Sequence, residues 1–217
     1  MRRRLGLALS GGIARGPAHV GVLSVLEREG VPIDCVAGVS AGSLVGALHC
    51  AGLTADELND FLPEVGWHLL ARPAWPGRGF VSFEALEDWL IDLIGDLYFS
   101  QLGRPLAVVA TDLETSAPVT FTEGRLARIV HASCAVPGLV APVMIDGRAY
   151  GGGGASNNLP AAAARGLGAE VVVGVDLFGP GAIAARSPLT TGLAVLENFV
   201  RHSGGGLQAV DCLISPA

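Results

Sequence analysis

The chain has 217 residues, of which 50% are hydrophobic and 16% are charged; this balance favours one globular domain with a buried core and excludes a disordered chain. Its formal net charge of -6 at pH 7 argues against a nucleic-acid-binding surface. All 14 basic residues are arginine, which excludes a P-loop lysine, Schiff-base chemistry and a serine–lysine dyad.

Four aliphatic runs bounded by glycines or turn residues predict the buried strands of a sheet. They cover residues 4–10, 33–39, 106–110 and 170–176. Asp146-Gly147 is a two-residue turn signal and predicts a hairpin between residues 143–145 and 148–150. A last strand is predicted over residues 209–215.

Helical patterns separate these runs, and their ends carry the usual signals. Pro17 and Gly30 mark the start and the end of a first helix, and residues 41–50 are expected to form a second. Thr54 and Glu57 form a capping box for a third helix. Two later helices are predicted after serine caps, at Ser82 and Ser187. Strands that alternate with helices predict an α/β fold, with a central, mostly parallel sheet covered by helices on both faces.

Residues 36–55 carry no charge over the nominal length of a membrane span. Gly38 and Gly42 favour a turn inside this stretch, which divides it into a strand end and a short helix. We therefore expect no membrane span. The apolar run after the arginines at positions 2–4 is too short for a signal peptide. Residues 72–79 are rich in proline and glycine and predict a mobile surface loop.

The cysteines have the spacing of neither a metal site nor a redox motif. They are Cys35, Cys50, Cys134 and Cys212, each within an apolar stretch. We expect four free thiols in a reducing compartment, which indicates a cytoplasmic protein.

A possible nucleophile lies between the second predicted strand and the helix that follows it. Residues 38–42 read Gly-Val-Ser-Ala-Gly and fit G-x-S-x-G in the context of a nucleophile elbow. The flanking glycines permit a sharp turn that leaves the hydroxyl of Ser40 exposed. The N-terminus of the next helix favours developing negative charge. A tight turn with an incidental serine is the alternative interpretation of the pentapeptide.

A second glycine-rich loop, residues 10–16, follows the first predicted strand. The backbone N–H groups in such a loop can converge on an anion. Ile13 stands where a dinucleotide-binding fingerprint has its middle glycine, so that fingerprint is absent. Arg15 is either part of the anion site or a solvated loop residue.

Five segments, in this order, resemble the conserved blocks of patatin-like phospholipases. They are residues 7–23, 38–43, 110–113, 132–138 and 147–160. The first resembles the family's oxyanion loop and first helix, the second its nucleophile elbow, and the last the segment with its catalytic Asp-Gly-Gly. The resemblance implies a single patatin-like acyl hydrolase domain over residues 1–217, with truncation at the C-terminus left open.

The resemblance also implies a mechanism. Ser40 would attack the carbonyl carbon of an acyl ester, and the loop with Gly11, Gly12, Ile13 and Arg15 would bind the oxyanion. The substrates would be phospholipids or lysophospholipids. The family's serine–aspartate dyad requires no metal and no cofactor.

Two positions depart from the family pattern. Ile13 replaces a usual glycine, and its branched side chain narrows the allowed backbone conformations. Counted back from the Asn-Asn-Leu-Pro at 157–160, the catalytic aspartate falls on Gly152, which cannot accept a proton. Asp146 lies about 20 Å away along an extended strand, and Asp176 ends a different strand. No motif places the histidines in a site: His19, His49, His68, His131 and His202.

Gly152 leaves three interpretations of the chain. It is a crippled or inactive acyl hydrolase, a non-catalytic lipid-binding protein, or a deliberately inactivated enzyme. We expect peripheral, reversible contact with a membrane, through an apolar rim near Trp67 and Trp75. The alternative is that these tryptophans pack in the core.

Overall fold

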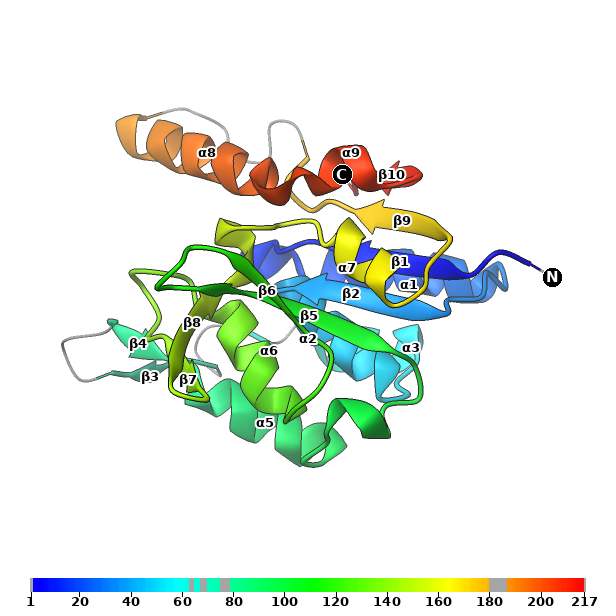
Figure 1. Cartoon of the computed structure of the whole chain (residues 1–217), viewed down its shortest axis with the longest axis horizontal. Helices are drawn as coiled ribbons and strands as arrows, with labels where there is room; N and C mark the ends of the chain where they lie inside the picture. Colours follow the sequence, from blue (N-terminus) through cyan, green and yellow to red (C-terminus); the bar gives the residue numbers. More distant parts are fainter. Residues whose placement is uncertain (1, 63–64, 67–69, 75–78, 180–186, 217) are drawn as a thin grey trace.

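The computed structural model describes residues 2–62, 65–66, 70–74, 79–179 and 187–216. A β-sheet forms the centre of the fold (Figure 1). Within these residues the sheet has eight strands in the order β10-β9-β1-β2-β5-β8-β7, and β6 also pairs with β5. The strands are β1 (Leu5–Leu9), β2 (Cys35–Val39), β5 (Leu106–Asp112), β6 (Pro118–Phe121), β7 (Val143–Ile145), β8 (Arg148–Gly152), β9 (Val171–Val175) and β10 (Cys212–Ile214). The helices are α1 (Pro17–Arg28), α2 (Ala41–Cys50), α3 (Ala55–Phe61), α5 (Glu84–Ile94), α6 (Leu126–Cys134), α7 (Ala161–Gly166), α8 (Pro188–Arg201) and α9 (Gly206–Ala209).

Most neighbouring strands of this sheet are parallel. β10, β9, β1, β2 and β5 run in one direction. β6 and β8 pair antiparallel with β5, and β7 pairs antiparallel with β8. The predicted central, mostly parallel sheet is therefore confirmed.

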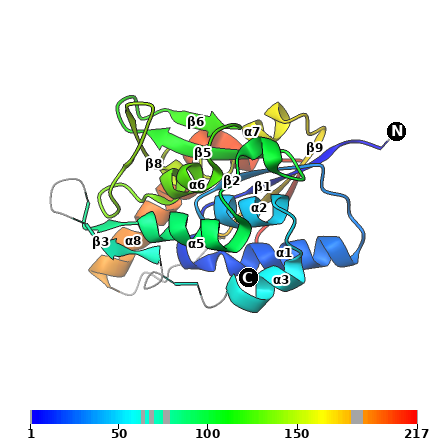
Figure 2. The same cartoon turned by 90° about the horizontal axis from the view of Figure 1, so that it is seen from below.

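Helices cover both faces of the sheet, as predicted. Along β1, Leu7 and Leu9 belong to a large hydrophobic cluster with α1, α2, α3, α5 and α6, whereas Ala8 belongs to a smaller cluster with α7. Successive side chains of a strand point to opposite faces, so the two clusters lie on opposite sides of the sheet. Figure 2 shows α7 on one side of the sheet, and α1, α2 and α5 on the other.

The first two strands end together at one edge of the sheet. β1 and β2 are parallel, and Leu9 pairs with Gly38. The glycine-rich loop after β1 therefore begins beside the turn after β2. This edge brings the two predicted loops together, although about 30 residues of sequence separate them.

Several local predictions are confirmed. Thr54 and Glu57 form the capping box of α3, and Asp146-Gly147 forms the turn between β7 and β8, with positive φ at both residues. The uncharged stretch of residues 36–55 divides into β2 and α2. Within the described residues, no helix has the length and hydrophobicity that a membrane crossing needs.

Other elements differ from the prediction. The strand β6 and the helices α6 and α7 were not predicted. The predicted loop at 72–79 begins as a short strand, β3 (Arg72–Pro73), which pairs with β4 (Val81–Ser82); residues 75–78 lie outside the described residues. The helix expected after Ser82 begins at Glu84, whose N–H donates to the Ser82 hydroxyl at 3.2 Å.

The four cysteines are free thiols, and only Cys212 is exposed.

Candidate active site

Ser40 stands on the sharp turn between β2 and α2. Its φ of 50° and ψ of -119° lie in a region that non-glycine residues rarely adopt, at a cost of about 1–3 kcal/mol. The turn also requires both flanking glycines. A Cβ at Gly38 would lie 2.4 Å from the carbonyl oxygen of Gly42, and a Cβ at Gly42 would lie 2.3 Å from that of Leu9. Ser40 therefore lies on a tight turn between a strand and a helix N-terminus, with a glycine required on each side.

Helix α6 fixes this elbow from one side. The backbone N–H of Ser40 donates to the hydroxyl of Ser133 at 2.8 Å, and that hydroxyl donates to the carbonyl oxygen of Val109 at 2.6 Å. On the other side, the hydroxyl of Ser43 donates to the carbonyl oxygen of Ser40 at 2.7 Å. The amide of Ser40 is thus committed to the protein, and an oxyanion would need other donors. The role of Ser133 was not predicted from the sequence.

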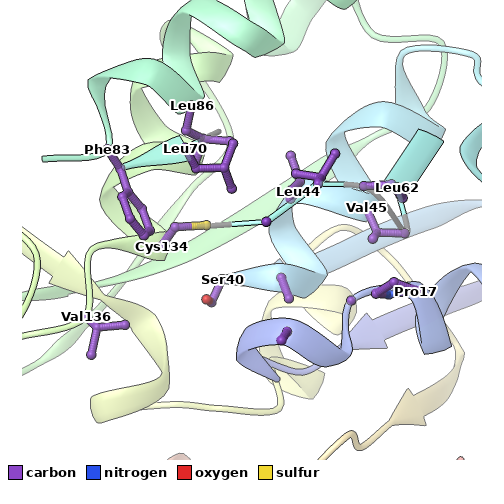
Figure 3. A pocket seen from close by; sticks show the side chains of 15 residues that line it. Pro17, Ser40, Leu44, Val45, Leu62, Leu70, Phe83, Leu86, Cys134 and Val136 are labelled. Atoms are coloured by element: carbon purple, nitrogen blue, oxygen red, sulfur yellow. The ribbon is translucent and has the colours of Figure 1, made fainter. Parts of the chain in front are cut away.

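The side chain of Ser40 opens into an apolar pocket of about 110 Å³ (Figure 3). The pocket is lined mainly by aliphatic and aromatic side chains from α2, from the segment that follows α3, from the start of α5 and from the residues just after α6: Leu44, Val45, Leu62, Val65, Leu70, Phe83, Leu86 and Val136. Among the described lining residues, Ser40 alone has a side-chain oxygen or nitrogen. An apolar pocket of this kind suits a hydrocarbon chain.

Cys134, at the end of α6, also lines this pocket. Its thiol contacts the hydroxyls of Ser40 and Ser43, and burial raises the pKa of the Cys134 thiol to about 12. The cysteine is therefore a neutral neighbour of Ser40 and cannot serve as its base at neutral pH.

The predicted oxyanion loop lies against Ser40. A Cβ placed on Gly11 would be 3.6 Å from the Cβ of Ser40. Within the described residues, the N–H groups of Gly11 and Gly12 have no hydrogen-bond acceptor. Ile13 begins a 3₁₀ turn, Ile13–Arg15, that leads into α1. Unpaired backbone N–H groups beside a nucleophile are the donors that a tetrahedral intermediate needs.

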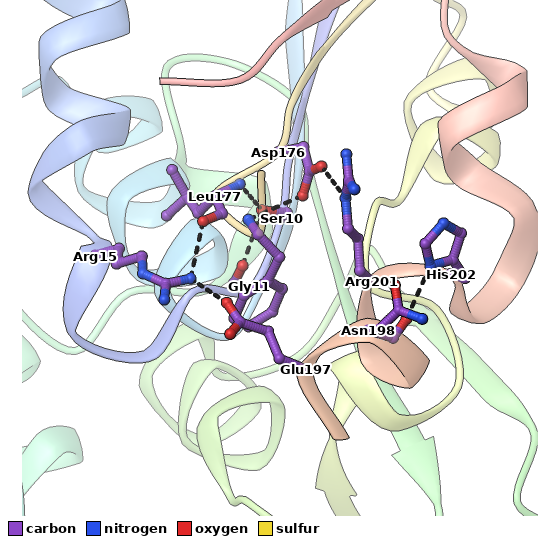
Figure 4. Close-up of polar contacts among 10 residues, drawn as sticks. Ser10, Gly11, Arg15, Asp176, Leu177, Glu197, Asn198, Arg201 and His202 are labelled. Atoms are coloured by element: carbon purple, nitrogen blue, oxygen red, sulfur yellow. Dashed lines mark hydrogen bonds and ion pairs between the residues drawn. The ribbon is translucent and has the colours of Figure 1, made fainter. Parts of the chain in front are cut away.

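The side chain of Arg15 is bonded to groups other than this donor pair. Its N–H donates to the carbonyl oxygen of Gly12 at 2.9 Å and closes the 3₁₀ turn. Its guanidinium donates to the carbonyl oxygen of Leu177 at 3.0 Å, forms an ion pair with Glu197 of α8, and lies over the ring of Phe178 (Figure 4). In this conformation the side chain of Arg15 links the glycine-rich loop to Leu177 and to α8.

Gly152 lies two strands away from Ser40, at the end of β8. Val39 pairs with Val109 on β5, and the next residue of β5, Ala110, pairs with Gly152. Two steps of about 4.8 Å between strands put the Cα atoms of Ser40 and Gly152 about 10 Å apart. A serine and an aspartate side chain span most of that gap.

The backbone at Gly152 does not demand glycine. Its φ of -53° and ψ of 126° are ordinary for any L-residue. An added Cβ would lie 3.2 Å from the carbonyl oxygen of Ala135, a tight contact that a shift of a few tenths of an ångström would relieve. The N–H of Gly152 donates to that same oxygen at 2.6 Å. The position could therefore hold an aspartate, but the chain has none there.

Nearby carboxylates are committed elsewhere. Asp146 lies in the turn at the opposite end of β8. Asp112 accepts bonds from two turn N–H groups and from Arg148, and these bonds lower its pKa. Asp176 is fully buried and accepts from the N–H of Phe178 and from Arg201. None of these three carboxylates hydrogen-bonds to Ser40 within the described residues.

The described histidines occupy structural positions. His19 bonds the carbonyl oxygen of Ser10 through Nε2 at 2.8 Å, and burial lowers its pKa to about 4. His49 is buried near Glu27, and burial lowers its pKa. His131 contacts Glu87 at 2.5 Å, and His202 contacts a carbonyl of its own helix. His68 lies outside the described residues. Within the described residues, no three potential ligand side chains gather into a metal site.

Comparisons with known proteins agree with this geometry. The sequence model described as patatin-like phospholipase matches residues 7–165. An uncharacterised NTE family protein of Mycobacterium tuberculosis is 37% identical over 186 residues, which cover 84% of this chain and 51% of that protein. The lysophospholipase nte1 of Aspergillus fumigatus is 30% identical over 88% of this chain and 13% of its own length.

A solved structure shares the fold. The crystal structure of VipD from Legionella pneumophila matches with a TM-score of 0.66 at 15% identity, over 80% of this chain and 50% of VipD. The chain thus spans about half of the mycobacterial relative and of VipD, and a smaller part of the fungal enzyme.

Proposed function

Because the chain belongs to the patatin-like phospholipase family, we propose that it is built to hydrolyse lipid acyl esters, with Ser40 as the nucleophile. The observation that carries this proposal is the strained Ser40, which opens into an apolar pocket beside the free N–H groups of Gly11 and Gly12. Strain of this kind is retained where a reaction uses it. The substrate class is a phospholipid or a lysophospholipid, with its acyl chain in the pocket.

In the first step, the Ser40 oxygen bonds to the ester carbonyl carbon, and the carbonyl electrons move to its oxygen. The backbone N–H groups of Gly11, Gly12 and the adjacent Ile13 donate hydrogen bonds to this oxyanion. The C–O bond to the alcohol then breaks, the alcohol leaves with a proton, and the acyl group remains on Ser40. Water attacks the acyl-enzyme, releases the fatty acid and restores the hydroxyl.

Both attacks need a base, and here the chain is deficient. The Ser40 proton must pass to an acceptor as the new bond forms. In the family pattern, the aspartate aligned with Gly152 fills this role, and glycine cannot. Among the described residues we find no side chain that would accept this proton in place of the aspartate, so we expect hydrolysis to be crippled or absent.

A second candidate function follows from Gly152 itself: a non-catalytic lipid-binding protein. The pocket and the oxyanion loop would then hold a lipid ester without cleaving it. In both cases contact with a membrane is peripheral. The rim expected at Trp67 and Trp75 lies outside the described residues, and a cytoplasmic location remains part of the proposal.

The test restores the base. Initial rates on a soluble p-nitrophenyl ester are compared for the chain, for Gly152→Asp, and for Gly152→Asp with Ser40→Ala. Loss of a residue that merely orients the base of a triad costs about 10⁴ in kcat, so Gly152→Asp should raise the rate by at least about 10³. Ser40→Ala should abolish the gain.

Gly152→Asn controls for side-chain volume without a base and should stay at the background rate. Fast, Ser40-dependent turnover by the unmodified chain would mean that another group is the base. A folded Gly152→Asp protein with no gain on any ester would favour the lipid-binding function.

A further inference from the structure

Helix α8 is attached to the site with its charged side toward the protein. Glu197 pairs with Arg15 of the oxyanion loop, and Arg201 pairs with the buried Asp176 (Figure 4). Glu197 and Arg201 are four residues apart and so share one face of the helix. Two ion pairs on that face fix the rotation of α8 about its axis.

The opposite face of α8 is apolar and open to solvent. Val195, Leu196 and Phe199 are 49%, 58% and 70% exposed. At about 100° per residue, Phe199 lies about 160–200° around the helix from Glu197 and Arg201. A surface helix usually buries its apolar stripe and exposes its charges. Here the arrangement is reversed, which marks the outer face as an interaction surface.

We propose that this outer face of α8, formed by Val195, Leu196 and Phe199, docks the protein on the surface of a lipid bilayer. The inference rests on the proposed function, because the pocket beside Ser40 must receive its lipid from somewhere. An amphipathic helix that lies in the interface and buries three large apolar side chains is a known means of peripheral attachment.

The position of the face supports this occupant. Through Arg15, α8 is fastened to the loop beside Ser40. Phe80 and Leu139, which are 77% and 41% exposed, are joined by a backbone hydrogen bond near the β3–β4 pair. Both views show α8 and β3–β4 at the same end of the molecule (Figures 1 and 2). Phe80 and Leu139 therefore add exposed apolar side chains at the end of the molecule that carries α8.

Area argues against a second copy of the chain as the occupant. A stable interface buries about 800 Å² on each partner, and three partly exposed side chains on one helix offer far less. Insertion into the headgroup region has no such threshold, because each buried apolar side chain adds to the affinity independently.

The charges of α8 and of the whole chain indicate which kind of lipid surface the helix would contact. In the described part of α8 the charged side chains are Glu197 and Arg201, and both are engaged in ion pairs. With a net charge of -6 on the whole chain, attraction to anionic lipid is not expected. Docking should therefore occur on zwitterionic vesicles and change little with salt.

The test is co-sedimentation with phosphatidylcholine vesicles at low and high salt. The unmodified chain should bind, and Leu196→Gln with Phe199→Gln should lower the partition coefficient at least tenfold. Val25→Gln, which changes a 46% exposed apolar residue of α1, is the matched control and should bind normally. Thermal unfolding of each variant checks that the fold is retained.

Three results would overturn the proposal: no binding by the unmodified chain, undiminished binding by the double variant, or binding that requires anionic lipid. A double variant that turns a dimer into a monomer on size-exclusion, with vesicle binding unchanged, would assign the face to a second copy. Docking uses neither Ser40 nor position 152, so Ser40→Ala should bind like the unmodified chain. Vesicle binding without any hydrolysis by Gly152→Asp would contradict the proposed function and leave the docking face intact.

Discussion

The nucleophile region and the base region of the site contain glycines for different reasons. Around Ser40, a Cβ on Gly38 or Gly42 would collide with backbone atoms at 2.4 or 2.3 Å. At Gly152 the backbone angles suit any residue, and a Cβ would meet its nearest neighbour at 3.2 Å. The fold therefore requires the glycines at positions 38 and 42, whereas it does not require a glycine at position 152.

The Ser40 region and the position of Gly152 are structurally independent of each other. The elbow, the oxyanion donors and the apolar pocket stand without help from position 152. The strained turn at Ser40 therefore forms independently of the residue at position 152. Experiments can address the two regions one at a time.

The largest effect is expected from an alanine at the elbow. Gly42→Ala places a methyl group 2.3 Å from the carbonyl oxygen of Leu9 and 2.6 Å from that of Ser10, and should lower the free energy of unfolding by about 3 kcal/mol or more. Gly152→Ala is the matched control and should change it by less than about 1 kcal/mol. Urea unfolding measures both. Similar losses for the two variants would erase the distinction between the regions.

The pH dependence of the free energy of unfolding tests the packing of the loop beside Ser40. His19 supports the oxyanion loop at Ser10, and burial holds its pKa at about 4, below the unfolded value of about 6.5. As pH falls from 6.5 to 4, the unfolded chain binds a proton that the folded chain refuses. The free energy of unfolding should therefore fall by up to about 3 kcal/mol across this window.

His19→Gln keeps a donor for the carbonyl oxygen of Ser10 but cannot titrate. Its stability should change less with pH over the same window, as measured by urea unfolding at several pH values. Equal pH dependence in the two proteins would show that other groups govern the acid sensitivity.

Local patterns predicted the elements that carry their own signals. Pro17 at the start of α1, the Thr54–Glu57 capping box and the Asp146-Gly147 turn are short-range features, and each forms as expected. The elbow at Ser40 was likewise recognisable, because glycine spacing and its position after a strand specify the turn.

Contacts between distant segments were beyond such patterns. Ser133 holds the amide of Ser40 across 93 residues, and Glu197 holds Arg15 across 182 residues. Ser133 lies in a segment that resembles a family block, but the residues around Ser133 and Glu197 do not indicate which residue each one contacts. Arg15 was for this reason assigned to the oxyanion site, although its guanidinium is drawn toward the carboxylate of α8. The reversed orientation of α8 has the same origin, since only its ion pairs decide which face turns inward.

The most direct measurement of the central claim is covalent trapping of the nucleophile. The chain and Gly152→Asp are incubated with a fluorophosphonate, and the adduct is located and timed by mass spectrometry. We predict that both proteins are modified on Ser40, and that Gly152→Asp reacts at least about 10³-fold faster because its carboxylate accepts the serine proton. Equally fast labelling of Ser40 in both proteins, or an adduct on another residue, would contradict the account.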